Sequence, residues 1–176
     1  MKEAPTGPPG AAAAGARAIT PRAAVRVACD TISAAAIAAW VGGHVALGAY
    51  AARIAFRDLP RDLASTTMTT VFGSFDTLAR VALALLLLCV VSRVVALGRA
   101  ALRGADFVLL AAACALLAVG AAGIFYAHPA IERMFHEGNT LSPAFAAMHK
   151  LSEKLGHLEA LSAVIFFGAL AAPRRA

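Results

Sequence analysis

The sequence predicts an all-α integral membrane protein: a four-helix bundle with a short outer helix between the third and fourth spans. Of the 176 residues, 60% are hydrophobic and 15% are charged, whereas soluble domains carry roughly 25% charged residues. The charges that remain flank long apolar runs, and four of these runs reach the roughly 20 residues that a helix needs to cross a bilayer. The net charge of +6 belongs to these flanks rather than to a basic, aromatic-rich patch, so nucleic acid is excluded as a partner and the lipid bilayer is expected.

The four spans can be placed from their apolar runs. We expect the first from about Thr31 to Phe56, the second over Thr77–Leu97, the third over Ala105–Ala127, and the fourth ending at Ala172. The first residues are rich in Ala, Gly and Pro and have no leucine-rich run, so they make a poor signal peptide. The expected organisation is therefore a disordered cytoplasmic tail over 1–28 and a transmembrane domain over 29–173.

Proline, serine and glycine mark the helix ends. Pro60 is expected near the start of the second long helix, and Ser142 with Pro143 should cap and begin the last one. Gly138 and Asn139 form a helix stop. Pro129 lacks a backbone donor, so the third helix should kink or restart there, and the residue before it, His128, is disfavoured in a continuous helix.

The charges of the loops predict the orientation. An even number of spans places both termini and the central loop on one side, and that side is richer in basic residues. The positive-inside rule then makes this side cytoplasmic, so both termini and the central loop are expected there. The basic residues of this side are Lys2, Arg17, Arg22, Arg26, Arg93, Arg99, Arg103, Arg174 and Arg175, against Arg53, Arg57, Arg61, Arg133, Lys150 and Lys154 on the other.

Small residues recur at four-residue spacing on two spans and predict close helix packing. They are Ala34, Ala38, Gly42 and Ala46 on the first span, and Cys114, Ala118 and Ala122 on the third. The three cysteines, Cys29, Cys89 and Cys114, are far apart in the sequence and are interpreted as small buried hydrophobic residues.

Ionisable residues at membrane depth are the main functional signal, because such groups are costly in hydrocarbon and face a partner or a cavity. His44 lies near the middle of the first span, and Asp76, Arg80 and Glu159 lie nearer the outer boundary. Structural roles remain open for each of them. Asp76 and Arg80 can form an ion pair within one helix, Glu159 can pair with Arg80, and His44 can hydrogen-bond a carbonyl of a neighbouring helix.

The pattern His-x3-Glu-x3-His occurs twice. His149, Glu153 and His157 lie on one stripe of the last helix, which can point into the bundle toward Asp76, Arg80 and His44. Imidazoles and a carboxylate at this spacing are typical ligands of zinc or copper, so these three residues are the candidate metal site. The stripe can equally be a solvated amphipathic face. The first copy, His128 to His136, is weaker evidence because of Pro129.

A haem b group is the other cofactor that the histidines allow. It would be held between His44 and His157, although these two residues lie at different depths. No nucleophile arrangement, phosphate-binding loop, His-Glu-x-x-His or Cys-x-x-Cys motif is present, so no catalytic residue is assigned and a non-enzymatic role is favoured.

Three stretches of the chain resemble a known family over residues about 30 to 172. They are residues 38–64, the outer segment 128–135 and residues 145–170. The first carries Trp40, Gly42, Gly43 and Phe56-Arg57-x-Leu59-Pro60, and the last carries Phe145, His149 and Ser152. This pattern resembles that of bacterial four-helix membrane proteins of unknown function related to eukaryotic transmembrane protein 205. The resemblance implies four transmembrane helices and no assigned reaction. Similarity to copper-resistance membrane proteins and to haem-dependent four-helix oxidases is more distant.

The leading functional hypothesis is a small transport, metal-handling or complex-accessory component of the membrane. His149, Glu153 and His157 would line an outer polar entrance above His44, Asp76 and Arg80. The alternatives are a haem b redox protein, with His44 as a ligand, and a purely structural subunit that assembles with membrane-protein partners or with its own copies.

Overall fold

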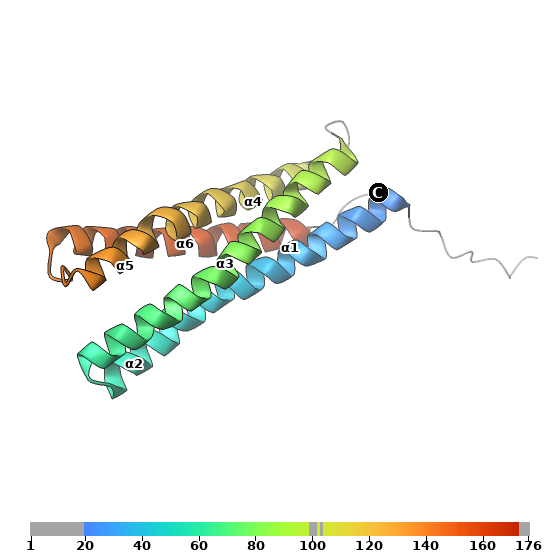
Figure 1. The fold of residues 1–176 in the computed structure, drawn as a ribbon. Coiled ribbons are helices and arrows are strands. Elements are labelled where there is room, and N and C mark those ends of the chain that lie inside the picture. The colour runs from blue at the N-terminus through green and yellow to red at the C-terminus, as the bar shows by residue number, and fades with distance from the viewer. Residues whose placement is uncertain (1–19, 99–101, 103, 173–176) are drawn as a thin grey trace, which may run out of the picture.

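The computed structural model describes residues 20–98, 102 and 104–172. It confirms the all-α four-helix architecture, with no strand among the described residues. The first rod consists of α1, a π-helical segment η1 and α2, and the third rod of α4, a second π-helical segment η3 and the short helix α5 (Figure 1). The bounds are α1 Pro21–Val45, η1 Ala46–Ala51, α2 Ala52–Asp58, α3 Arg61–Leu97, α4 Gly104–Ala122, η3 Gly123–Ala127, α5 His128–His136 and α6 Pro143–Ala171.

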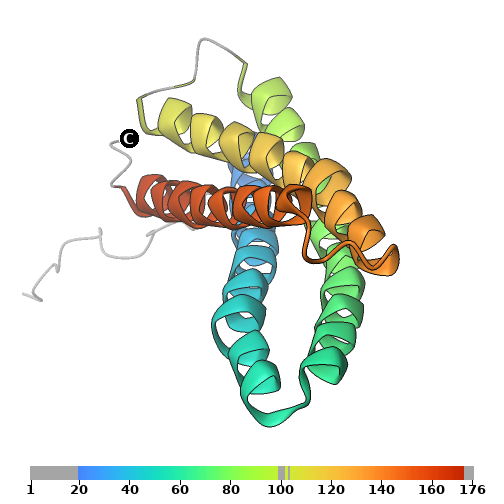
Figure 2. The same ribbon diagram turned by 90° about the vertical axis from the view of Figure 1, so that its left-hand side faces the viewer.

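The helices form two hairpins that cross each other. The first rod packs along α3, and the third rod packs along α6. In Figure 2 the blue-to-green hairpin of α1 and α3 runs steeply across the yellow-to-red hairpin of α4 and α6. The start of α1 and the end of α6 lie at the same end of the bundle as the end of α3 (Figure 1). The α2–α3 turn and the α5–α6 turn lie at the opposite end, where the two hairpins diverge.

The first helix starts earlier than the sequence predicted. Thr20 caps it, since its hydroxyl accepts a hydrogen bond from the Ala23 backbone N–H at 3.3 Å, and Pro21 follows at the first turn. Helix α1 therefore begins at Pro21, whereas the apolar run placed its start near Thr31. Residues 1–19 of the expected tail lie outside the described residues.

The other helix ends follow the predicted signals. Pro60 immediately precedes α3, and the Ser142 hydroxyl accepts a hydrogen bond from the Phe145 backbone N–H at 3.1 Å to cap α6. Gly138 has a φ of 72°, a left-handed conformation that glycine adopts without a steric penalty and that ends α5.

The core lies where the hairpins cross. Trp40 is fully buried, and its ring packs so closely over Gly120 of α4 that a Cβ there would lie 2.2 Å from a ring carbon. The largest other fully buried side chains are Phe166, Ile37, Leu86, Leu116 and Ile124. The small-residue stripes predicted as packing faces are wrong in part: Ala38 and Gly42 are exposed on α1, Ala46 is exposed at the start of η1, and Cys114 and Ala118 are exposed on α4. The neighbouring stripes fill the interface instead. They combine large side chains with other small residues, which include Ala36, Ala112, Ala113 and Gly120.

Each of the four rods is long and apolar enough to cross a membrane, which makes this a multi-pass membrane protein. The first rod has 38 residues, or about 57 Å, and α6 has 29 residues, or about 43 Å. The hydrocarbon core of a bilayer is about 30 Å thick, so every rod extends beyond it. Large apolar side chains are exposed along the outside of the bundle, as lipid contact requires.

Candidate metal centre

Four ionisable side chains from four different helical elements meet on the inside of the bundle. His44, near the end of α1, contacts Glu159 of α6, with His44 Nδ1 2.9 Å from Glu159 Oε2. The Glu159 side chain is 4% exposed and the His44 side chain 16% exposed. Helix α6 turns Glu159 inward, and Ser162, Ala163 and Phe166 continue the same buried face.

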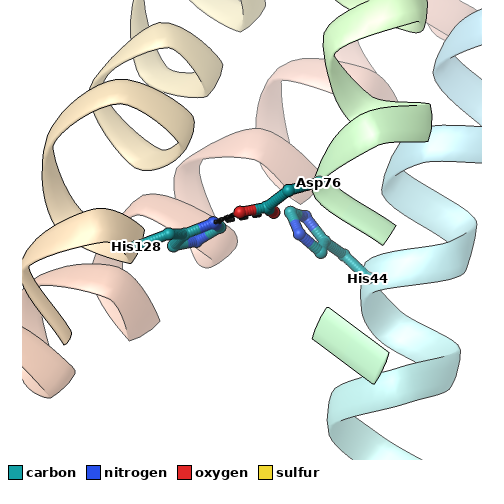
Figure 3. Close-up of side chains that lie close together, drawn as sticks. All are labelled: His44, Asp76 and His128. Carbon is teal, nitrogen blue, oxygen red and sulfur yellow. Dashed lines mark hydrogen bonds and ion pairs between the residues drawn. The ribbon is translucent and has the colours of Figure 1, made fainter. Parts of the chain in front are cut away.

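The second pair lies beside the first. His128 Nδ1 of α5 is 2.9 Å and 3.1 Å from the two carboxylate oxygens of Asp76 in α3. The rings of His44 and His128 are 5.8 Å apart and almost perpendicular. Figure 3 shows the Asp76 carboxylate pointing into the space that both imidazoles face.

His44, Asp76 and His128 have the spacing of metal ligands. One ligand atom from each of the three lies within 4.8 Å of the other two. Two ligands about 2.0 Å from a tetrahedral ion lie about 3.3 Å apart, close to the distance between His128 Nδ1 and Asp76. Glu159 on His44 Nδ1 is the carboxylate that commonly orients a metal-binding imidazole, and it leaves Nε2 of His44 available.

A π-helical segment adjoins each histidine. Shortly after His44, the Ala52 backbone N–H donates a hydrogen bond to the carbonyl of Leu47. The His128 backbone N–H donates to the carbonyl of Gly123. In both hydrogen bonds the acceptor lies five residues before the donor. Such π turns are rare and occur frequently at functional sites. The prediction that Pro129 interrupts the helix is confirmed by this turn. The prediction that His128 leaves the helix is wrong, since it has helical angles and begins α5.

Gly123 has no side chain and therefore leaves room for the His44–Glu159 and His128–Asp76 pairs. A Cβ at this position would lie 3.7 Å from Glu159 Oε1 and 3.7 Å from His128 Nε2. A longer side chain there would therefore enter the space between Glu159 and His128. The wide π turn and its glycine thus bring the backbone of the third rod close to the site.

The stripe predicted as the metal site faces outward. His149, Glu153 and His157 are all exposed, and His149 stacks on Phe145 with ring centroids 6.1 Å apart. Glu159 is only two residues beyond His157, but two residues turn a helix by about 200°, so these side chains lie on opposite faces. The structure brings Glu159 to His44 and leaves the stripe outside the cluster. Metal binding by the stripe, and haem b binding between His44 and His157, stay predictions.

The predicted ion pair between Asp76 and Arg80 is replaced by another contact. Asp76 is buried and bonds His128, while Arg80 is exposed and has no ion pair among the described residues. Asp76 and Arg80 are one helical turn apart, so their side chains could share a face of α3. The Asp76 carboxylate instead points inward and contacts His128 of α5. The Glu159–Arg80 pairing is likewise replaced by Glu159–His44.

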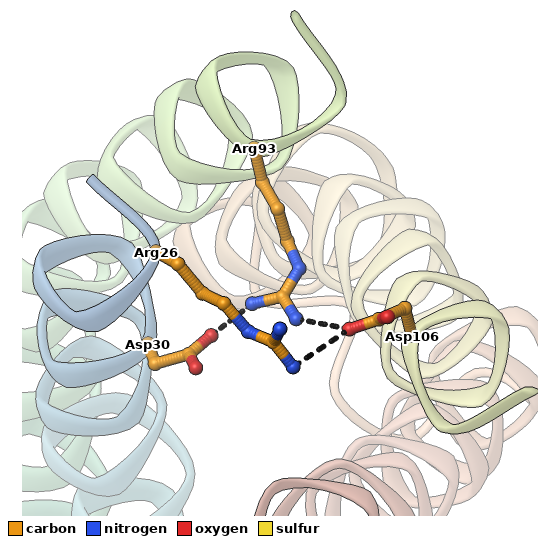
Figure 4. Close-up of polar contacts among 4 residues, drawn as sticks. All are labelled: Arg26, Asp30, Arg93 and Asp106. Atoms are coloured by element: carbon orange, nitrogen blue, oxygen red, sulfur yellow. Dashed lines mark hydrogen bonds and ion pairs between the residues drawn. The ribbon is translucent and has the colours of Figure 1, made fainter. Parts of the chain in front are cut away.

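A second polar cluster closes the other end of the bundle, near the start of α1. Arg93 of α3 bonds Asp30 of α1 and, at 2.5 Å, Asp106 of α4, and Arg26 of α1 contacts Asp106 at 3.3 Å. Figure 4 shows Arg93 reaching between the two aspartates. These four residues, here termed the arginine clasp, join the two hairpins and carry no net charge. Arg93 is 2% exposed.

Sequence reasoning identified His44, Asp76 and Glu159 from their depth but missed that His128 lies beside Asp76 and His44. The signal was present: His128 ends the third apolar run, at the same outer depth as Asp76. The arginine clasp was missed because Asp30, Arg93 and Asp106 lie near span ends, where charges ordinarily contact water and lipid headgroups. The 3.6-residue period of each helix does not show which span ends lie next to each other in the bundle.

The fold and the buried cluster define a class: a multi-pass four-helix membrane protein with a histidine–carboxylate site between its hairpins. Residues 35–140 match the model of a domain of unknown function, DUF4149, and because this match covers more than half of the chain, the protein belongs to that family. The matched range includes His44, Asp76 and His128, whereas Glu159 lies beyond it. No curated protein matches the chain, and no solved structure does.

Proposed function

We propose that this protein is a non-enzymatic, metal-handling membrane protein that binds a divalent transition-metal ion between its two hairpins. The ligands are His44, Asp76 and His128, with Glu159 orienting His44. The observation that carries the proposal is the convergence of these three ligand atoms within 4.8 Å from three separate helices. Such convergence requires the tertiary fold, which a solvated helical stripe does not.

The charge of the site favours a cation. Asp76 and Glu159 are both buried, and neither forms an ion pair with Lys or Arg among the described residues. With neutral imidazoles, the four side chains carry two negative charges at a place where burial of charge is costly. A divalent cation offsets both charges and satisfies the imidazole nitrogens at once.

The chemistry of the ligands selects the class of ion. Two imidazoles with carboxylate oxygen suit zinc, copper, nickel or iron, whereas magnesium and calcium prefer ligands that are all oxygen. Zn²⁺ is the natural probe, because it accepts imidazole and carboxylate in a tetrahedral site. The π turns beside His44 and His128 support a binding role over a purely structural one.

The finer placement of the protein is part of this proposal. The loop charges support an orientation with both termini in the cytoplasm, and the family resemblance supports a bacterial inner membrane location. The Trp40-x-Gly42-Gly43 pattern of the first span supports the proposed kinship with transmembrane protein 205. Trp40 anchors the core, and a Cβ on Gly43 would lie 2.4 Å from the Phe75 ring.

Zinc titration of the purified protein in mild detergent tests the proposal. We expect one ion per chain in the wild type, and at least about a tenfold loss of affinity in His44→Ala and in His128→Ala, as expected for the loss of one ligand. The double variant His149→Ala/His157→Ala is the matched control and should bind normally. Wild-type affinity in both cluster variants would overturn the proposal, and loss in the control alone would assign the metal to the exposed stripe.

The same sample distinguishes the remaining alternatives. A Soret band that His44→Ala abolishes would establish a haem b protein in place of a zinc site. A stoichiometric partner that co-purifies with zinc-free protein would establish an accessory subunit. We expect neither.

A further inference from the structure

Two thiols that are far apart in the sequence meet beside the arginine clasp. Cys29 of α1 and Cys89 of α3 are both buried, and their side chains are hydrogen-bonded to each other. Cys29 is the neighbour of Asp30, and Cys89 lies one helical turn before Arg93. Cys114 is exposed and lies elsewhere on α4.

The thiols share a small cavity with an unused hydrogen-bond donor. The cavity has a volume of about 10 Å³, roughly that of one water-sized probe, and its lining includes Cys29, Ser33, Cys89 and Arg93. Although Arg93 uses its terminal nitrogens to bond Asp30 and Asp106, its buried Nε has no hydrogen-bond partner. A buried donor without a partner is uncommon and points to a small polar ligand.

We propose that Cys29 and Cys89 form a peroxide-reactive dithiol that closes to a disulfide between α1 and α3. One thiol loses its proton and its sulfur attacks an oxygen of hydrogen peroxide, so that the O–O bond breaks, a sulfenic acid forms, and the departing hydroxide takes the proton and leaves as water. The second thiol then attacks the sulfenic sulfur, forming the S–S bond and releasing a second water. In total, two thiols are oxidised and one peroxide is reduced to two waters.

The surroundings select peroxide as the oxidant. Hydrogen peroxide is close to water in size, whereas a glutathione-type disulfide or a quinone is far larger than this cavity. The free Nε–H of Arg93 can donate a hydrogen bond to the departing oxygen. The product links the two helices of the first hairpin at the same level as the arginine clasp.

Mass spectrometry of the full chain in detergent tests the proposal, with Cys114→Ser as the working background because Cys114 is exposed. Peroxide at micromolar concentration should remove 2 Da from this variant, block both thiols from alkylation, and yield a Cys29–Cys89 linked peptide that dithiothreitol cleaves. Adding Cys89→Ser should abolish the linked peptide. Two freely alkylated thiols and no linked peptide after millimolar peroxide would overturn the proposal.

The role of Arg93 is tested separately in the same background. Arg93→Lys keeps the charge but removes Nε–H, so disulfide formation should slow about tenfold, the rate equivalent of one lost hydrogen bond. Asp106→Asn disturbs the clasp without removing Nε–H and should react at nearly the original rate. Equal slowing in both variants would refute the assignment of Nε as the donor.

Discussion

Single side chains set the net charge of each polar cluster inside this bundle. The two clusters differ in that net charge. The arginine clasp contains two guanidiniums and two carboxylates and is neutral as a group. Removing one member of a buried ion-pair group costs more than the group contributes, because the remaining charges stay in a poorly solvated place.

Arg93→Met should therefore destabilise the protein strongly. The substitution removes the guanidinium that bonds both Asp30 and Asp106, and we expect a loss of about 3–5 kcal/mol in the free energy of unfolding. Thermal unfolding in one fixed detergent measures the effect. The triple variant Arg93→Met/Asp30→Asn/Asp106→Asn should recover part of the lost stability, and a triple variant less stable than the single one would contradict this account.

Gly120 has a steric requirement of its own. Gly120→Ala places a methyl group 2.2 Å from the Trp40 ring, so the ring or the helix must shift, at a cost of about 1–3 kcal/mol. Gly168→Ala on α6 is the control, since nothing lies within 4 Å of its Cβ position, and it should leave stability unchanged or raise it. Equal unfolding temperatures for the two variants would contradict the packing argument.

At the residue scale, the sequence predicted which ionisable groups have partners but not which partners. Depth along a helix follows from counting residues, and it identified His44, Asp76 and Glu159. The direction in which a side chain points within the bundle depends on how the hairpins cross. The residue pattern of a single helix does not determine that crossing. For this reason the sequence left both an inward and a solvated stripe open for His149, Glu153 and His157, and the structure places all three outward.

At the scale of elements, the helix ends were the most predictable features, and the helix faces the least. Thr20, Pro60, Ser142 and Gly138 act on their own backbone neighbours, so local chemistry decides where the helices begin and end. The packing faces of α1 and α4 depend on the neighbouring helices. Neither π turn was predicted, because a turn widened by one residue is set by local backbone crowding together with tertiary contacts.

Pro129 follows the π turn beside the candidate metal centre. It has no N–H, and its ring displaces the carbonyl four residues earlier, that of Phe125. Pro129→Ala permits an ordinary α-turn, which would rotate His128 by up to about 100° away from Asp76.

We expect Pro129→Ala to keep its helical circular dichroism but to lose at least about tenfold in zinc affinity, as for a ligand variant. Pro143→Ala, a first-turn proline of α6 with no π turn beside it, should bind zinc normally. Unchanged zinc affinity in Pro129→Ala would show that zinc binding does not depend on the π turn.

At the scale of the whole molecule, the two crossing hairpins place their turns at one end. Single cysteines in place of Leu59 and Asn139, which are both exposed, should be labelled by an impermeant maleimide from the same side of sealed vesicles. A cysteine at Thr20 should be labelled from the other side. The Cys114→Ser background removes the exposed native thiol, and labelling of Leu59 and Asn139 positions from opposite sides would contradict the four-span topology.

The crossing of the hairpins also has a mechanical consequence. Each hairpin is held along its length by its own two helices, while the hairpins meet around Trp40 and Gly120, with the clasp to one side and the histidines to the other. Two stiff hairpins joined in this way pivot about the point where they cross. We therefore expect a change that separates the hairpins at the Arg93 end to alter their spacing at the His128 end.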